Sequence, residues 1–331
     1  MTTATPLEIL DLRHYKSSHL RAVLDAENVV WRERLHWDYR ASAQLLLQYL
    51  DAHTLPGYVA IIKGRIVGYS FFVYDQAKAV IGDVFSVPQA NSGDSTDGSK
   101  SLQSTEIEET LLHHLLETLF ASPGVERIES QLLFHPSGLH TDLFRAAGFR
   151  IFPRLFLYRS LLGFQPSPIA ELPHHLEIMP WSPELIHPAG QLIVEAYQNH
   201  LDSQINDQYR TIHGALRFLH NVVQYPGCGV FAPADSRVVY DCNTHQMVGL
   251  LLCSRISPES GHITQICVHP DYRRQGIARL LLALAADGFA RQRISEITLT
   301  VTASNTDALS LYRVDGYQTR HRFDATVWEK E

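Results

Sequence analysis

The spacing of apolar residues along the first half of the chain predicts two early helices followed by a run of strands. Apolar residues at helical spacing predict helices over 18–28, 40–50 and 107–120, and alternating or β-branched runs predict strands over 7–12, 58–62, 66–74, 79–87 and 125–133. Gly64 separates two of these strands and can supply the positive φ of a hairpin turn. Residues 89–104 offer almost nothing to bury, which predicts a mobile insertion.

The second half of the chain predicts the same order of elements. Strands are expected over 176–179, 229–232, 237–240, 246–255, 262–268 and 297–301, and helices over 183–200, 206–223, from about Gln275 and from Thr306. Pro188 is a possible break within the first of these helices. The repeated order predicts two related domains.

Short sequence matches support this repeat. LFRAAGF at 143–149 parallels LYRVDGY at 311–317, RIVG at 65–68 parallels QMVG at 246–249, and Val87-Pro88 parallels the VHP run at 268–270. A proline-rich stretch between the halves predicts a linker. We therefore expect a first domain over 1–165, a linker over 166–173 and a second domain over 174–331.

Composition and charge exclude several functional classes. The 331 residues are 45% hydrophobic, enough for two cores, and the formal net charge of -7 argues against nucleic acid or an anionic membrane as the main partner. The first residues do not resemble a signal peptide and no apolar run reaches transmembrane length, which predicts a cytoplasmic protein. The four cysteines form no close pair, and the adjacent histidine pairs at 113–114 and 174–175 point to different sides of an element. No metal site is expected from these patterns.

The segment with the clearest chemistry is the turn after the strand 262–268. It reads Arg-Arg-Gln-Gly-Ile-Ala over 273–278 and lies at the start of a predicted helix, where unpaired backbone N–H groups favour an anion. Gly276 and Ala278 leave room for a phosphate near the backbone, and Arg273 and Arg274 add positive charge. The turn is therefore suited to a diphosphate.

This turn resembles the pyrophosphate-binding segment of the GNAT acyltransferase superfamily, whose pattern is Arg/Gln-x-x-Gly-x-Gly/Ala after a V-x-P strand end. The resemblance continues through the strand 297–301, Asn305, Leu311-Tyr312 and Gly316-Tyr317. It implies an α/β (α+β) fold of two tandem GNAT-like domains, each a mixed central sheet flanked by helices. It also implies acetyl-CoA, or another acyl-CoA, as cofactor. The implied cofactor-binding residues are Ile266, Cys267, Val268, Arg273, Arg274, Gln275, Gly276, Ile277, Ala278 and Asn305.

The resemblance implies catalytic roles as well. Tyr312 matches the usual general acid, a phenol that protonates the departing thiolate, although a tyrosine on a short amphipathic helix is often a core residue. Asn305 could equally cap the helix that begins at Thr306. Four residues are candidates for the general base or for positioning a water: Glu195, His200, Asp202 and Gln265.

The two halves do not carry the same chemistry. The first half has no arginine-glycine turn, and Phe144 stands where Tyr312 stands, so we interpret it as a degenerate copy. The expected function is an acetyl-CoA-dependent N-acetyltransferase that acts on an amine of a small molecule or peptide through its second half. The alternative is a non-catalytic acyl-CoA-binding sensor or scaffold. The sequence leaves open the acceptor, the acyl chain and the oligomeric state.

Overall fold

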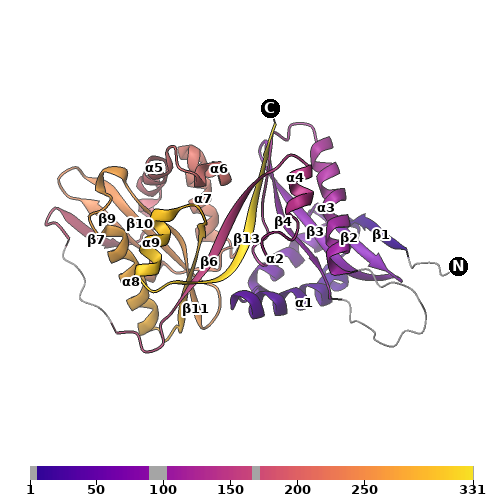
Figure 1. Cartoon of the computed structure of the whole chain (residues 1–331), viewed down its shortest axis with the longest axis horizontal. Coiled ribbons are helices and arrows are strands. Elements are labelled where there is room, and N and C mark those ends of the chain that lie inside the picture. Colours follow the sequence, from indigo (N-terminus) through magenta and orange to yellow (C-terminus); the bar gives the residue numbers. More distant parts are fainter. Residues whose placement is uncertain (1–5, 89–102, 166–171, 331) are drawn as a thin grey trace. The chain divides into compact units, whose positions relative to one another are not determined.

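The computed structural model describes residues 6–88, 103–165 and 172–330, and these form two compact units (Figure 1). Unit 1 comprises residues up to Arg34, Tyr39–Phe152 and the segment from Phe323, whereas unit 2 comprises Leu35–Asp38 and Pro153–Arg322. Each unit therefore takes a segment from far away in the sequence. These units do not follow the linear boundaries 1–165 and 174–331, and most of the predicted insertion and linker lies outside the described residues.

Unit 1 is built around a mixed sheet in the order β1-β2-β3-β4-β5-β13. Among the described strands of this unit, β4 and β5 form a parallel pair, and the pairs β1–β2, β2–β3, β3–β4 and β5–β13 are antiparallel. Apolar residues of α3 and Phe144 of α4 pack against the sheet in one core. The elements are β1 (Leu7–Asp11), α1 (Ser17–Leu35), α2 (Arg40–Asp51), β2 (Gly57–Ile62), β3 (Arg65–Asp75), β4 (Lys78–Ser86), α3 (Ser104–Ala121), β5 (Arg127–Gln131), α4 (Thr141–Ala146) and the last residues of β13 (Gln318–Glu329).

Unit 2 repeats this plan with the strand order β6-β12-β11-β10-β9-β7, and β8 pairs beside them with β10. Here β11 and β12 are the parallel pair. The elements are β6 (Arg150–Ser160), β7 (Leu176–Pro180), α5 (Ile186–Tyr197), α6 (Asp202–Ile205), α7 (Ile212–Gln224), β8 (Val230–Phe231), β9 (Arg237–Asp241), β10 (Gln246–Arg255), β11 (Ser260–Val268), α8 (Ile277–Arg291), β12 (Glu296–Thr302) and α9 (Thr306–Val314).

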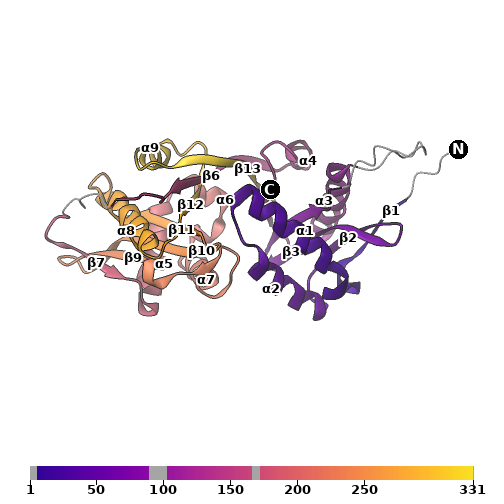
Figure 2. The same ribbon diagram turned by 90° about the horizontal axis from the view of Figure 1, so that it is seen from below.

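Alternating residues of the central strands of unit 2 build two separate cores. Leu251 and Cys253 of β10 pack with α8 and α9, whereas Leu250 and Leu252 of the same strand pack with α5 and α7. Because side chains of a strand alternate between its faces, the helices cover both faces of this sheet (Figure 2). The predicted α/β fold of two mixed sheets flanked by helices is confirmed.

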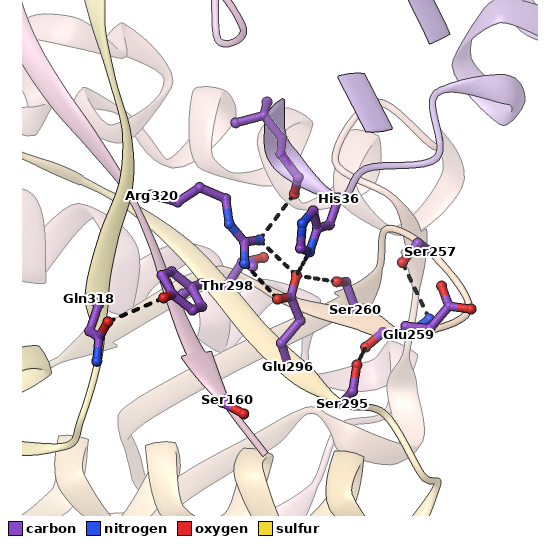
Figure 3. A network of polar contacts seen from close by, with 12 residues as sticks. His36, Ser160, Ser257, Glu259, Ser260, Ser295, Glu296, Thr298, Gln318 and Arg320 are labelled. Atoms are coloured by element: carbon purple, nitrogen blue, oxygen red, sulfur yellow. Dashed lines mark hydrogen bonds and ion pairs between the residues drawn. The ribbon is translucent and has the colours of Figure 1, made fainter. Parts of the chain in front are cut away.

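A buried ion pair joins β13 and the Leu35–Asp38 segment to β12 in unit 2 (Figure 3). Arg320 donates two hydrogen bonds to Glu296, at 2.8 and 2.7 Å, and His36 lies 3.3 Å from the same carboxylate. Burial raises the pKa of Glu296, but hydrogen bonds from Arg320 and Ser260 outweigh this effect and lower the pKa overall. The pair therefore fixes β13 and the Leu35–Asp38 segment to the edge of β12.

Several predicted elements differ from the observed ones for local reasons. Pro188 does not break α5, because it lies in the first turn, where no N–H is needed. The helix expected over 206–223 begins only at Ile212, because Thr211 caps it by accepting a hydrogen bond from the Gly214 N–H. No helix of the described ranges is long and apolar enough to cross a bilayer. The cytoplasmic location stays a prediction.

Candidate functional site

The parallel strands β11 and β12 separate part of the way along their length. They pair from Ser260↔Glu296 to Ile263↔Leu299, and beyond this point neither strand pairs with the other. The register of β11 with β10 shifts at the same place, so that Thr264 is an extra residue in the ladder, a β-bulge. The two strands thus form a fork, and one edge of β11 beyond Thr264 lacks a neighbouring strand.

The backbone of Ile266 and Val268 faces this fork. His269 donates its N–H to the carbonyl of Val248 on β10, at 2.9 Å. Because backbone groups alternate in direction along an antiparallel strand, the groups of Ile266 and Val268 point away from β10, while those of Cys267 point toward it. Of the three residues predicted to pair with a cofactor, two therefore direct their backbone groups away from β10, although the carbonyl of Val268 accepts a hydrogen bond from Arg273.

The turn after β11 presents its backbone as an anion site. Arg274 and Gly276 adopt left-handed backbone conformations, with φ of 64° and 84°. Gly276 is the N-cap of α8, no side chain caps this helix, and its first turn contains no acidic residue. A Cβ added at Gly276 meets no atom within 4 Å, so the space above the backbone is open. Successive N–H groups in such a turn form a concave nest for phosphate oxygens.

The side chain of Arg273 makes hydrogen bonds within the protein. Its guanidinium donates to the carbonyl of Ala196, at 2.8 Å, and to that of Val268, at 3.3 Å. It therefore ties the end of α5 to the end of β11 and contributes charge near the turn from this fixed position. Arg274 and Gln275 are exposed, and Ile277 and Ala278 form the first turn of α8.

Asn305 caps the helix α9. Its Oδ1 accepts a hydrogen bond from the N–H of Ala308, at 3.1 Å, which is the capping role considered from the sequence. The cap uses only the amide oxygen and therefore leaves the amide N–H2 for a ligand. Asn305 follows β12, at the mouth of the fork.

Gln265 lies inside the fork region and is 4% exposed. Its Oε1 accepts a 3.4 Å hydrogen bond from the hydroxyl of Tyr209, which stacks on Tyr197. Its Nε2 is buried without a hydrogen bond to any described residue. A buried donor without a partner costs free energy, so a ligand carbonyl in this position would be favoured.

Glu195 lies at a different place. Its Oε2 is 3.6 Å from Nε2 of His269, and its Oε1 accepts a hydrogen bond from Gln191. This carboxylate is therefore beside the end of β11 and close to the start of the turn of residues 273–278. The structure does not bring it into contact with Gln265 or Tyr312.

Asp202 is the carboxylate that the fold brings to the mouth of the fork. The hydroxyl of Thr302, the last residue of β12, donates to its Oδ1, and His200 Nδ1 lies 3.7 Å from its Oδ2. His200 Nδ1 accepts the N–H of Asp202, at 3.1 Å, so its other ring nitrogen carries the proton in the neutral form. Asp202 and Thr302 are a hundred positions apart, so no local sequence signal connects them.

Tyr312 is 6% exposed and belongs to the core that α8 and α9 share. Its ring packs 5.6 Å from that of Tyr317. Burial raises the pKa of Tyr312, the nearby Asp202 carboxylate raises it further, and Arg154 opposes both effects. The phenol therefore stays protonated at neutral pH, as a general acid must, and it lies close enough to Asp202 to sense its charge.

Comparisons with known proteins give a family match for part of the chain and a shared fold for nearly all of it. Residues 197–317 match the sequence profile of the acetyltransferase (GNAT) family. A GCN5-related N-acetyltransferase from Sphaerobacter thermophilus is similar over 98% of this chain and 97% of its own, with 16% identity and a TM-score of 0.66. A tandem GNAT protein from the clavulanic acid biosynthesis pathway is similar over 98% of both chains, with 15% identity and a TM-score of 0.60. A search of curated proteins gives no match.

The match to the GNAT family model thus lies within the second half of the chain, in unit 2. Because similar folds cover nearly the whole chain, the protein is a tandem GNAT-fold protein, as the sequence resemblance implied.

Proposed function

We propose that the protein is an acyl-CoA-dependent N-acyltransferase whose active site is the fork of unit 2, with acetyl-CoA as the expected donor. The observation that carries this proposal is the edge of β11 at Ile266 and Val268 that β12 does not pair with, followed along the chain by the start of α8, which no side chain caps. The edge offers backbone groups to an amide-containing arm, and the helix start offers N–H groups to a diphosphate. The strand edge and the helix start are adjacent along the chain, just as the amide-containing arm and the diphosphate are adjacent in the cofactor.

The cofactor supplies a thioester, whose carbonyl carbon accepts the amine while the carbon–sulfur bond breaks. The N–H of Ile266 or Val268, facing the fork, is placed to polarise the thioester carbonyl, and Gln265 Nε2 offers a second donor. Tyr312, protonated at neutral pH, gives its proton to the departing sulfur. Gly276 and the first N–H groups of α8 hold the diphosphate.

Asp202, paired with His200, accepts the proton that the attacking amine loses, directly or through a water. We favour this carboxylate over Glu195, because Asp202 bonds to the end of β12 and influences Tyr312, whereas Glu195 contacts His269. The acidic side chains and stacked tyrosines on this side of unit 2 suit an acceptor that arrives as an ammonium ion, such as an amine of a small molecule or peptide.

Calorimetry with acetyl-CoA tests the donor site, and we expect one site per chain. The variant Gly276→Asp should lose binding by at least about a hundredfold, because like charges facing each other cost several kcal/mol. Gly124→Asp is the matched control, since Gly124 has the same φ of 84° and the same open space but lies in unit 1. Equal loss in both variants would show general unfolding, and unchanged binding in both would place the diphosphate elsewhere.

Turnover of acetyl-CoA with a panel of amines, aminoglycosides, amino acids and peptides tests the reaction. Release of CoA together with an N-acetylated product would support the transferase. Tight acetyl-CoA binding without transfer to any acceptor class would instead favour the sensor or scaffold.

A further inference from the structure

Three side chains that the acyl-transfer proposal does not use converge inside unit 1. Glu108 comes from α3, and His135 and His140 come from the segment between β5 and α4. Glu108 Oε2 lies 3.8 Å from His135 Nδ1 and 3.3 Å from His140 Nε2, and one ligand atom from each residue falls within 4.8 Å of the others. The three residues are 6%, 5% and 5% exposed.

The hydrogen bond of His135 fixes which ring nitrogen faces the carboxylate. Its Nε2 lies 2.8 Å from the carbonyl oxygen of Val84. A carbonyl can only accept, so Nε2 carries the proton and Nδ1 presents a lone pair to Glu108 in the neutral ring. A lone pair and a carboxylate oxygen that face each other in a buried site repel, and a proton or a metal ion between them would relieve this repulsion. Metal-binding histidines commonly donate their other N–H to a backbone carbonyl in this way.

His140 is the second, independent indication of a ligand. Both of its ring nitrogens are buried without a hydrogen bond to a described residue, and only Nε2 has a charged neighbour, the Glu108 carboxylate at 3.3 Å. Its ring packs 5.0 Å from that of His135, and both rings line a small pocket that opens to solvent. Buried polar atoms without partners are rare in folded proteins because each one costs free energy.

Glu108 is held in place from its other side. Its Oε1 accepts hydrogen bonds from the N–H and the hydroxyl of Ser86, both at 3.1 Å. These bonds leave Oε2 directed at the two histidines. Zinc bonds of about 2.0–2.2 Å place neighbouring tetrahedral ligands roughly 3.4 Å apart, close to the two distances observed from Oε2.

From this geometry we propose that Glu108, His135 and His140 bind a divalent transition-metal ion, zinc by its preference for nitrogen and oxygen ligands, with one coordination position open to the pocket. Two histidines and one glutamate form a three-residue set that suits zinc and keeps a fourth position for water or a ligand. The same pocket is also lined by Ser130, Thr141, Asp324 and Thr326. The adjacent histidine pairs considered from the sequence take no part. His135 and His140 have a spacing that zinc-binding histidines can have, but the third residue, Glu108, lies on a different element, so no local motif marks the site.

The location of this cluster connects it to the fold repeat. β4 and β5 pair only from Lys78↔Arg127 to Ile81↔Ser130, so they also form a fork. The carbonyl of Val84, on the edge of β4 beyond the last pair, is the one that His135 occupies. The cluster of Glu108, His135 and His140 therefore lies at the fork of unit 1.

The proposal is tested on the full chain with zinc alone and with cobalt(II) as a spectroscopic probe. The exposed thiols Cys228 and Cys242 are first replaced by serine in all samples, because free thiols also bind these metals. We expect one zinc per chain after dialysis against metal-free buffer, a higher unfolding temperature with zinc, and the visible absorption of tetrahedral cobalt.

Variants separate this site from other histidines of the surface. His140→Gln and Glu108→Gln should each weaken zinc binding by at least about tenfold, since even second-shell changes have effects of that size. His113→Gln, on the exposed side of the same helix α3, should bind like the parent protein. His140→Cys should add a thiolate-to-cobalt charge-transfer band, a gain of signal that a misfolded protein does not give.

Absence of stoichiometric zinc and of tetrahedral cobalt absorption in the folded parent protein would overturn the proposal and leave a buried histidine–carboxylate ion pair. Retained affinity in both His140→Gln and Glu108→Gln would overturn it as well. Neither result depends on whether unit 2 transfers acyl groups.

Discussion

The forks of the two units have the same backbone plan. Both parallel pairs hold together over four residues, Lys78–Ile81 in unit 1 and Ser260–Ile263 in unit 2, and then separate. Both carry a β-bulge at the next residue, Gly82 and Thr264. The N–H of Val87 bonds to Val67 just as that of His269 bonds to Val248. The shape of the fork is thus kept in both copies.

The side chains that fill the forks differ. By this register Val84 corresponds to Ile266. The Val84 carbonyl accepts a hydrogen bond from His135, whereas that of Ile266 accepts none from the described residues. Phe144, in the position of Tyr312, has no proton to give, and the sequence after β4 has no arginine-glycine turn. The comparison teaches that sheet packing preserves the opening, while a few side chains decide what can enter it.

The largest effect is expected from cutting the chain between the apparent halves. Residues 174–331 lack β6, which pairs with β12 and supplies the buried Leu155, Phe156 and Leu157. Each such side chain contributes about 2 kcal/mol of burial, a large share of the roughly 5–15 kcal/mol that stabilises a domain. We expect this fragment to be insoluble or unfolded by circular dichroism.

A fragment of residues 150–331 is the matched control for that cut, because it keeps β6. It should be measurably more stable than 174–331. A soluble, monomeric and fully active 174–331 fragment would show that β6 is dispensable and that unit 2 is independent of everything before it.

The next largest effect concerns the proton donor of unit 2. Tyr312→Phe imitates Phe144 of unit 1 and should lower kcat by about a hundredfold or more, with little change in acetyl-CoA affinity. Tyr317→Phe removes a neighbouring buried hydroxyl and should leave kcat within about twofold. Single-turnover kinetics with saturating acceptor provide the measurement.

The pH dependence adds a second test of the same residue. Because the folded-state pKa of Tyr312 is raised by burial, its ionisation should cause no loss of rate up to about pH 10, the ordinary value for tyrosine. A rate for Tyr312→Phe within about twofold of the parent, when chemistry limits the rate, would return this side chain to a packing role.

The smallest effect is expected from replacing the proposed general base, Asp202. Asp202→Asn should lower kcat/KM by about tenfold at neutral pH, less than the usual hundredfold of direct proton transfer, because water can take the proton. The loss should shrink at high pH, where the amine is already deprotonated. Glu195→Gln, which removes the other carboxylate, should have less effect; the reverse order would move the base to the His269 side.

Much of the fold could be predicted because local patterns of apolar and turn residues determine it. The hairpin at Gly64, the buried strands of both sheets and the helix start at Gly276 all follow from apolar spacing and turn residues. The strands β6 and β13 were not predicted. Pro153 and several arginines interrupt β6, and charged residues alternate along β13, so neither shows a strand pattern of its own.

The site was predictable only where its residues are close in sequence. The turn of residues 273–278 and the cap Asn305 carry local signals, and the structure places both at the fork. The bond of Arg273 to Ala196 and that of Thr302 to Asp202 join distant segments, so only the tertiary fold shows them. For the same reason the cluster of Glu108 with two histidines was missed.

The exchange of segments between the units has a consequence during synthesis. A ribosome releases the chain from its N-terminus, and domains commonly fold as they emerge. Unit 1 cannot do so completely, because β5 lacks its neighbour until Ala325–Glu329 of β13 has been made. The first half must therefore wait, with one sheet edge uncovered, until these residues have been made, and during this interval the nascent protein is most exposed to wrong strand pairing.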